Sequence, residues 1–216
     1  RANPTRLVYL VYNGFGGATI SSWMTPGASL YDSLETSVVA GLAAAGLSTI
    51  DGLLWWQGEA DYASSTYVSD FETVHANWRA ETWFPYNTPI VMMGVTHYLE
   101  TVDQAALAAF NVNLTKLEQR APAFRTYVHS SDMPTSNWIS GGTDLKAHMT
   151  GAGYYGAGRM AAQAYKAMIK GKGPQSIYTN PYTGNVTVTD DIYFGNDVNF
   201  SLTKPTSTTA VLSFDL

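Results

Sequence analysis

A chain of 216 residues is long enough for one α/β domain with a buried core and a small appendage. Charged residues make up 13% of the chain, against roughly 25% in average globular proteins, and the net charge of −5 comes without a basic cluster. The composition therefore gives no electrostatic footprint for nucleic acid and favours a neutral, hydrogen-bonding surface suited to sugars. With no cysteine, disulfides, thiolate metal sites and cysteine nucleophiles are excluded.

Apolar periodicity predicts strands and helices that alternate along the chain. The predicted strands span 6–12, 50–56, 89–95 and 124–129, and the predicted helices span 29–47, 67–84, 101–120 and 151–170. No apolar run approaches the ~18 residues of a membrane helix. The alternation predicts an α/β fold with a parallel sheet and helices on both faces.

The residue composition changes after the Gly-Lys-Gly-Pro stretch at 171–174. The remainder is rich in Thr, Asn, Val and Tyr, with turn signals between short apolar runs. We therefore expect an α/β domain over residues 1–171 and a small β-rich extension over residues 172–216.

The loop after the first predicted strand carries adjacent glycines in the sequence GGAT (16–19), followed by Trp23. Adjacent glycines allow a backbone N–H to approach an oxyanion without an intervening side chain, and Gly17 is the candidate for this role. The alternative is a simple turn that requires positive φ. Neither phosphate-binding glycine motif is present here.

The stretch WWQGEAD (55–61) follows the second predicted strand. Gln57 offers an amide donor for a developing oxyanion, and Glu59 can hold a histidine in the required tautomer. Trp56 would line the cleft. As alternatives, these polar residues cap the next helix, with Asp61 as its N-cap, or Glu59 and Asp61 form a glycosidase pair, which their close spacing disfavours.

Of the four histidines, His148 lies in a loop that enters the last helix, with Asp144 four residues before it. We expect His148 to be the general base. His75 falls mid-helix and is expected at the surface or in a groove, while His97 and His129 follow strands as rim or scaffold residues. No metal site is expected, because the His and carboxylate residues show no recognised ligand spacing.

Three blocks in this order, GGATISSW, WWQGEAD and DLKAHMTGAGYYGAGRMA, resemble those of the SGNH (GDSL-like) hydrolases. The resemblance covers residues 7–170 and points to the branch of sialate O-acetylesterases and acetylxylan esterases. Similar domains occur in phage tail spikes and fibres that deacetylate polysaccharides. The QGExD block is its most specific part.

The resemblance implies a serine esterase in a three-layer α/β/α fold without a cofactor. Gly17 and Gln57 would complete the oxyanion hole, and His148 would act as the base with Glu59 near it. The family's G-Q-S nucleophile block is absent, as is any G-x-S-x-G elbow, so we expect the serine before Arg1. Asp144 stands four rather than three residues before His148, which leaves Asp144, Glu59 or, more weakly, Asp132 as the triad acid.

The sequence thus predicts a carbohydrate O-acetylesterase acting on an acetylated glycan outside the cell, as a secreted bacterial protein or a virion tail component. Trp23, Trp56 and Asp61 are its expected substrate contacts, with no nucleic-acid or membrane partner. A longer chain or a homo-oligomeric, trimeric assembly would supply the missing serine. The rival hypotheses are a glycan-binding module that lacks a nucleophile and a structural tip of a larger assembly.

Overall fold

The computed structural model describes residues 8–95, 103–130, 133 and 148–169, together with the backbone of 200–203 and 211–214. The chain divides into two compact units, Arg1–Ile177 and Tyr178–Leu216. The candidate site residues all belong to the first unit. In the second unit, the described strands β4 (Phe200–Thr203) and β5 (Val211–Phe214) pair as an antiparallel hairpin.

The first unit is built around a parallel sheet of β1 (Leu53–Trp55), β2 (Ile90–Met93) and β3 (Arg125–Val128). The strand order is β1-β2-β3, so β2 is central and β1 is at one edge of the described sheet. Leu53 of β1 pairs with Ile90, which in turn pairs with Arg125. The predicted parallel sheet is confirmed, and its carboxyl ends all lie along the same edge.

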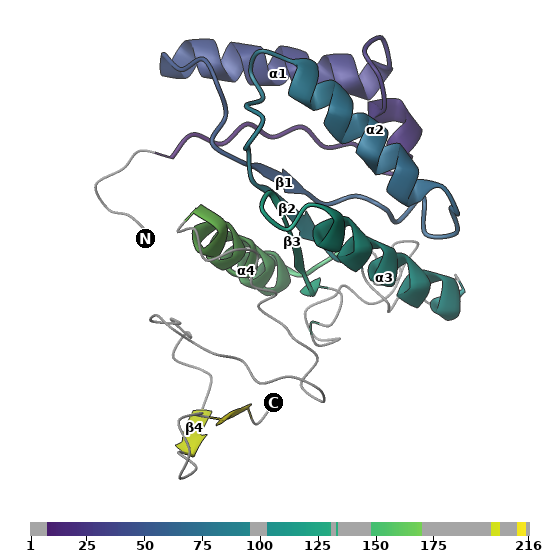
Figure 1. Cartoon of the computed structure of the whole chain (residues 1–216), viewed down its shortest axis with the longest axis vertical. Helices are drawn as coiled ribbons and strands as arrows, with labels where there is room; N and C mark the ends of the chain where they lie inside the picture. Colours follow the sequence, from purple (N-terminus) through teal and green to yellow (C-terminus); the bar gives the residue numbers. More distant parts are fainter. Residues whose placement is uncertain are drawn as a thin grey trace. The chain divides into compact units, whose positions relative to one another are not determined.

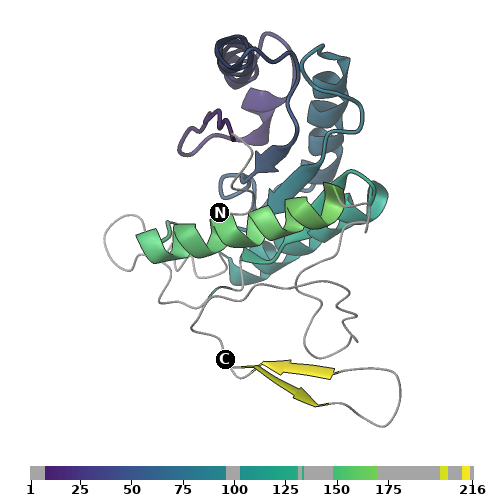
Figure 2. The same ribbon diagram turned by 90° about the vertical axis from the view of Figure 1, so that its left-hand side faces the viewer.

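Helices cover both faces of the sheet, as Figures 1 and 2 show. The described helices are η1 (Ile20–Trp23), α1 (Ser29–Ala45), α2 (Tyr67–Ala80), α3 (Gln104–Arg120) and α4 (Gly151–Ile169). Among the described residues, none of the helices is both long and apolar enough to cross a membrane.

The alternation of side chains along each strand divides the core into two clusters. On one face of the sheet, Ile90, Met92 and Tyr127 pack with apolar side chains of η1, α1, α2 and α3. On the other face, Val91 and Val128 pack with the small residues of α4. The three-layer α/β/α fold expected from the resemblance is therefore present.

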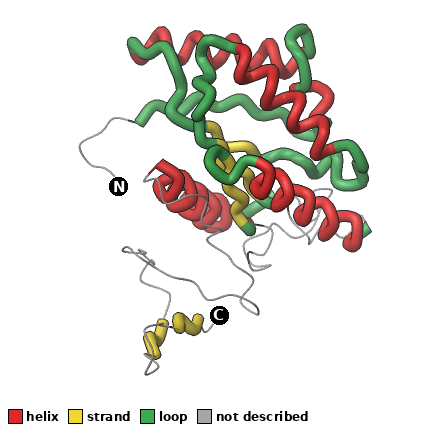
Figure 3. Tube along the Cα trace, viewed as in Figure 1, coloured by secondary structure: helices red, strands yellow, loops and turns green. Residues whose placement is uncertain are grey.

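The predicted first strand is wrong over the part that the structure describes. Residues 8–19 form no strand or helix (Figure 3), and the side chains of Val8, Leu10 and Tyr12 are 75%, 90% and 87% exposed. An apolar β-branched run becomes a strand only when a neighbouring strand satisfies its backbone groups. Within the described residues the β1 edge pairs with β2 alone, so this run has no such neighbour.

The second helix is also shorter than its apolar pattern predicts. α2 ends at Ala80, and the chain turns extended at Glu81 so that Trp83 and Phe84 enter the core, where they are 3% and 1% exposed. The Trp83 carbonyl then accepts a hydrogen bond from the Ile50 N–H. These aromatics supply apolar periodicity to the sequence, but tertiary packing, not helix propensity, fixes their place.

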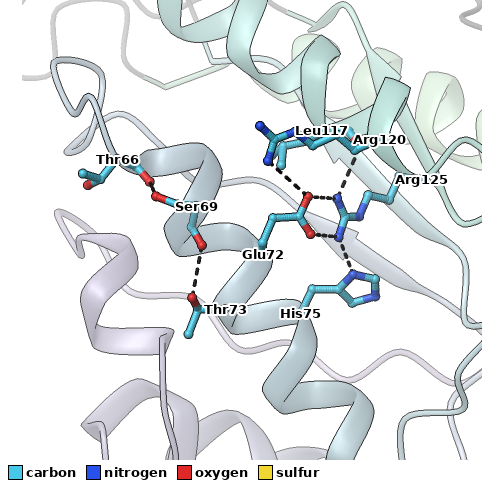
Figure 4. A network of polar contacts seen from close by, with 8 residues as sticks. All are labelled: Thr66, Ser69, Glu72, Thr73, His75, Leu117, Arg120 and Arg125. Atoms are coloured by element: carbon cyan, nitrogen blue, oxygen red, sulfur yellow. Dashed lines mark hydrogen bonds and ion pairs between the residues drawn. The ribbon is translucent and has the colours of Figure 1, made fainter.

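A buried polar network ties α2 to the amino end of β3 (Figure 4). The Arg125 guanidinium is 2% exposed and donates to both Glu72 carboxylate oxygens, at 2.7 and 2.6 Å. It also donates to the Leu117 carbonyl and to Nδ1 of His75, at 3.3 and 2.5 Å. Because arginine has no acceptor, Nδ1 must be unprotonated, and the His75 proton resides on Nε2.

The expected surface position of His75 is wrong, since its side chain is 2% exposed. The cause is the buried Arg125, whose guanidinium needs an acceptor on α2 in addition to Glu72. Burial, followed by the charges of Arg125 and Arg79, lowers the His75 pKa from 6.5 to about 3. His75 is therefore neutral in the folded protein at neutral pH.

Replacing His75 should weaken the dependence of the free energy of unfolding on pH at acidic pH. The unfolded chain binds a proton at His75 near pH 6.5 and the folded chain only near pH 3, so folding loses up to about 1.4 kcal/mol per pH unit as pH falls between these values. His75→Gln keeps an acceptor for Arg125 but cannot titrate. Urea unfolding from pH 8 to pH 4 should give parallel curves above pH 7 and a shallower fall for the variant below pH 6. Equal slopes throughout would contradict the assignment.

Candidate functional site at the carboxyl ends of the strands

Two of the predicted polar segments meet the sheet at the carboxyl ends of its strands. WWQGEAD begins at Trp55, the last residue of β1, and His148 lies between β3 and α4. Thr150 caps α4 by accepting the Gly153 N–H on its hydroxyl at 3.1 Å, so His148 stands two residues before the helix cap. Open parallel sheets bind ligands along this edge.

Gln57 is only 8% exposed, and both hydrogens of its side-chain amide are used within the protein. Nε2 donates to the Ala18 carbonyl at 3.0 Å and to Oδ2 of Asp61 at 2.5 Å. Exchanging the amide oxygen and nitrogen would place Oε1 against two acceptors, so the hydrogen bonds fix its orientation. To donate to an oxyanion, Gln57 must therefore give up one of these bonds.

The backbone of Gln57 is held separately by an aromatic pair. The Tyr67 hydroxyl donates to the Gln57 carbonyl at 3.2 Å and accepts from Nε1 of Trp55 at 3.1 Å. Tyr67 is fully buried, and burial is the main cause that raises its pKa. The loop that follows β1 is thus anchored to α2, a contact that the sequence pattern did not reveal.

Asp61 connects this loop to the glycine loop. Its Oδ2 accepts the Ile20 N–H at 2.8 Å in addition to the Gln57 amide, and its side chain is 9% exposed. The alternative in which Asp61 caps the next helix is wrong, because α2 begins at Tyr67 and its N-cap residue is Thr66. Asp61 instead accepts a hydrogen bond from the backbone of Ile20, 41 residues earlier in the sequence.

Gly58 allows the sharp turn between Gln57 and Glu59. Its φ is +138°, a value that side chains with a Cβ rarely adopt, and an added Cβ would collide with the ring of Phe110 on α3. The strand-end loop therefore packs directly against α3. This close approach explains a glycine between the two polar residues.

The pKa of Glu59 is affected by burial and by the charges around it. Glu59 is partly buried, and loss of solvation is the main cause that raises its pKa. The charge of His148 opposes this effect and lowers the pKa, while the neighbouring Asp61 raises it. The fold thus brings the carboxylate and the exposed histidine, 89 residues apart in sequence, into one field.

Gly17 and the aromatic residues take different positions around these groups. Gly17 is exposed, has φ of +71° and has open space where a Cβ would stand. Trp23 is 5% exposed and packs edge-to-face with Trp55, so its ring faces lie in the core. Trp56 is half-buried and packs against Tyr154 of α4, whose ring is 47% exposed.

Several predicted site residues lie outside the described residues, namely Asp144, Asp132 and His97. His129 is at the end of β3, with its ring packed edge-to-face on Tyr127. Among the described residues, no three His, Asp or Glu side chains gather as metal ligands. The catalytic, oxyanion and substrate-binding roles of the described residues stay predictions.

The parallel α/β fold places the segments that carry Glu59 and His148 after β1 and before α4, at the carboxyl ends of the strands. Residues 1–167 match the family described as carbohydrate esterase, sialic acid-specific acetylesterase. The chain belongs to this family, in agreement with the resemblance to SGNH esterases. No curated protein and no solved structure matches the chain.

Substituting Gly58 should test how tightly the strand-end loop is packed. Gly58→Ala introduces a strained φ and a clash with Phe110, and should lower the free energy of unfolding by about 2–4 kcal/mol. Gly16→Ala is the matched control, because no atom lies within 4 Å of its added Cβ. Urea denaturation at neutral pH measures both. Equal stability of the two variants would contradict the geometry of the loop.

Proposed function

We propose that this chain is the larger part of a carbohydrate O-acetylesterase, a serine hydrolase that removes acetyl groups from polysaccharide or sialic-acid-type substrates. Membership of the carbohydrate esterase family supports the class of reaction. The observation that carries the proposal is the placement of the Glu59 loop after β1 and of His148 just before α4, at the carboxyl ends of the strands, where the charge of His148 lowers the pKa of Glu59. A histidine with a carboxylate partner is the base that ester hydrolysis requires.

In this mechanism the serine oxygen attacks the acetyl carbonyl while His148 accepts the serine proton. The Gly17 N–H stabilises the resulting oxyanion, together with Gln57 once it releases one of its present acceptors. The C–O bond to the sugar then breaks, and His148 returns the proton to the departing sugar oxygen. Water then attacks the carbonyl of the acetyl-serine while His148 accepts a proton from the water. The bond between the serine oxygen and the acetyl carbon breaks, His148 returns the proton to the serine, and acetate is released.

The nucleophilic serine is expected on a segment before Arg1, as the resemblance implies. Two features of the described residues support a further strand beside β1. Leu54 of β1 is 51% exposed, and the apolar run at 8–12 lies unpaired and exposed. Within the described residues β1 pairs only with β2, so a parallel strand could pair along its other side, and its carboxyl end would reach the edge where Glu59 lies.

A glycan-binding function without catalysis is the second candidate. The observation that favours it is the pair formed by Trp56 and Tyr154, with centroids 5.9 Å apart and Tyr154 nearly half exposed. Aromatic faces of this kind offer apolar contact area and a polar edge to a sugar ring. Binding of an acetylated glycan by the intact protein with no release of acetate would favour this candidate.

The proposed substrate also implies the setting of the protein. Acetylated polysaccharides lie outside cells, so we expect a secreted bacterial protein or a virion tail component. The serine would then come from a longer chain or from a partner in a homo-oligomeric, trimeric assembly. Nucleic acid and membranes are not among the expected partners.

Removing the proposed base should abolish hydrolysis. In the intact protein, His148→Ala should lower kcat/KM for an acetylated aryl ester and for acetylated polysaccharide by about 10³-fold or more. His75→Gln is the matched control, because His75 contacts Arg125 at the opposite end of the sheet. Unchanged hydrolysis by His148→Ala, or no hydrolysis by the intact wild type, would overturn the proposal.

The triad acid can be identified by comparing Glu59→Gln with Asp144→Asn. Glu59 is the stronger candidate among the described residues because its charge interacts with His148. Its loss should lower kcat by on the order of 10²- to 10⁴-fold and leave KM nearly unchanged. Since burial raises the Glu59 pKa, the wild-type rate should fall on acidification from above pH 4.5. A larger loss from Asp144→Asn would assign the acid to Asp144.

A further inference from the structure

We propose that Asp61 is a positioning residue of the ester-cleaving site, which holds the glycine loop and the Gln57 amide in register with each other. This inference rests on the proposed esterase function and adds a residue that acts through others. It differs from the expected substrate contact of Asp61, because its carboxylate is directed at the protein itself. The chemistry concerned is stabilisation of the acetyl oxyanion by backbone and amide donors.

A small closed set of hydrogen bonds joins the glycine loop to the loop after β1. Oδ2 of Asp61 accepts from the Ile20 N–H and from Nε2 of Gln57, and the same Nε2 donates to the Ala18 carbonyl. The two loops are therefore joined at two positions of the backbone and through one shared carboxylate oxygen. We refer to Asp61, Gln57, Ala18 and Ile20 as the loop clamp.

The residues of the loop clamp are buried, so each lost hydrogen bond within it is costly. Asp61 is 9% exposed, Gln57 is 8% exposed and Ile20 is 2% exposed, so water cannot readily replace a lost acceptor. An unpaired buried donor carries the full cost of its lost hydration, and a carboxylate forms stronger hydrogen bonds than a neutral oxygen. The Ile20 N–H thus depends on this one oxygen, and one of the two hydrogens of Gln57 Nε2 depends on it as well.

The loop clamp brackets the proposed oxyanion donor. Gly17 immediately precedes Ala18, whose carbonyl is held by Gln57, and stands three residues before Ile20, whose amide is held by Asp61. Gly17 itself has φ of +71°, and the space where a Cβ would stand is open. The orientation of the Gly17 peptide is consequently set by these two neighbouring attachments.

Asp61 also holds the Gln57 amide whether or not the amide donates to the Ala18 carbonyl. When both hydrogens are used, as in this structure, Gln57 links Asp61 to the Ala18 carbonyl. If an oxyanion displaces the Ala18 carbonyl, the bond to Asp61 still fixes the direction of the remaining hydrogen. A positioning residue of this kind should affect turnover more than substrate binding.

The test compares Asp61→Ala, Asp61→Asn and Asp70→Asn in the intact protein, with an acetylated aryl ester as substrate. Asp61→Ala removes both accepted hydrogen bonds and should lower kcat by about 10- to 100-fold with less than about threefold change in KM. Asp61→Asn keeps one oxygen as acceptor and should recover most of the activity. Asp70→Asn, at a partly buried acid on α2 that accepts a hydrogen bond from the Thr66 hydroxyl away from the loop clamp, should match the wild type.

A double-mutant cycle and amide exchange separate positioning from loss of the fold. Gln57→Ala and Asp61→Ala combined should cost little more than the worse single variant, because both disrupt the same loop clamp. In Asp61→Ala the Ile20 amide should exchange faster with solvent, while amides of α2 around Phe71 keep their protection.

The outcomes are distinct. An active wild type with full turnover by Asp61→Ala, or a rise in KM alone, overturns the positioning role and leaves the esterase function standing. Failure of Asp61→Asn to recover activity likewise overturns it. An intact wild type that hydrolyses no acetyl ester overturns the proposed function, and the positioning role falls with it even if Ile20 exchange is accelerated.

Discussion

The candidate site depends on the hydrogen bonds between buried polar groups of the glycine loop and the loop after β1. Asp61 provides one carboxylate oxygen for the Ile20 N–H and the Gln57 amide, and Gln57 passes the connection on to the Ala18 carbonyl. Buried donors and acceptors must be paired, so the two loops have little freedom to separate. Gly17 and Glu59, which flank these residues in sequence, are positioned in part by this constraint, together with the Gly58 turn and the Tyr67 hydrogen bond.

A second constraint operates at the opposite end of the sheet. Arg125 is buried at the start of β3, and its charge requires Glu72 and His75 on α2 as partners. Breaking one member would leave an uncompensated buried charge, which is costly. The two networks attach α2 to both ends of the sheet, since Tyr67 at its start holds the Gln57 carbonyl. The strand-end loop is thus supported by elements that are themselves fixed.

Periodicity predicted the helices and three of the strands because each covers a buried face of the sheet. It was wrong at residues 8–12, where the residue types favour a strand but the described chain offers no neighbour to pair with. It also placed His75 at the surface, because helix position alone does not reveal a buried Arg125 across 50 residues. Local pattern predicts local structure, while pairing across the fold remains hidden in the sequence.

The same division applies to the site. The sequence blocks predicted Gly17, Gln57, Glu59 and His148 as site residues, and in the fold the charge of His148 acts on the pKa of Glu59. The contacts of Gln57 were not predictable, since its acceptors are 39 residues away and four residues ahead. Burial favours the protonated form of Glu59, whereas the charge of His148 favours the carboxylate. A substrate that excludes water would strengthen both effects, so the proton balance of this pair depends on an occupied site.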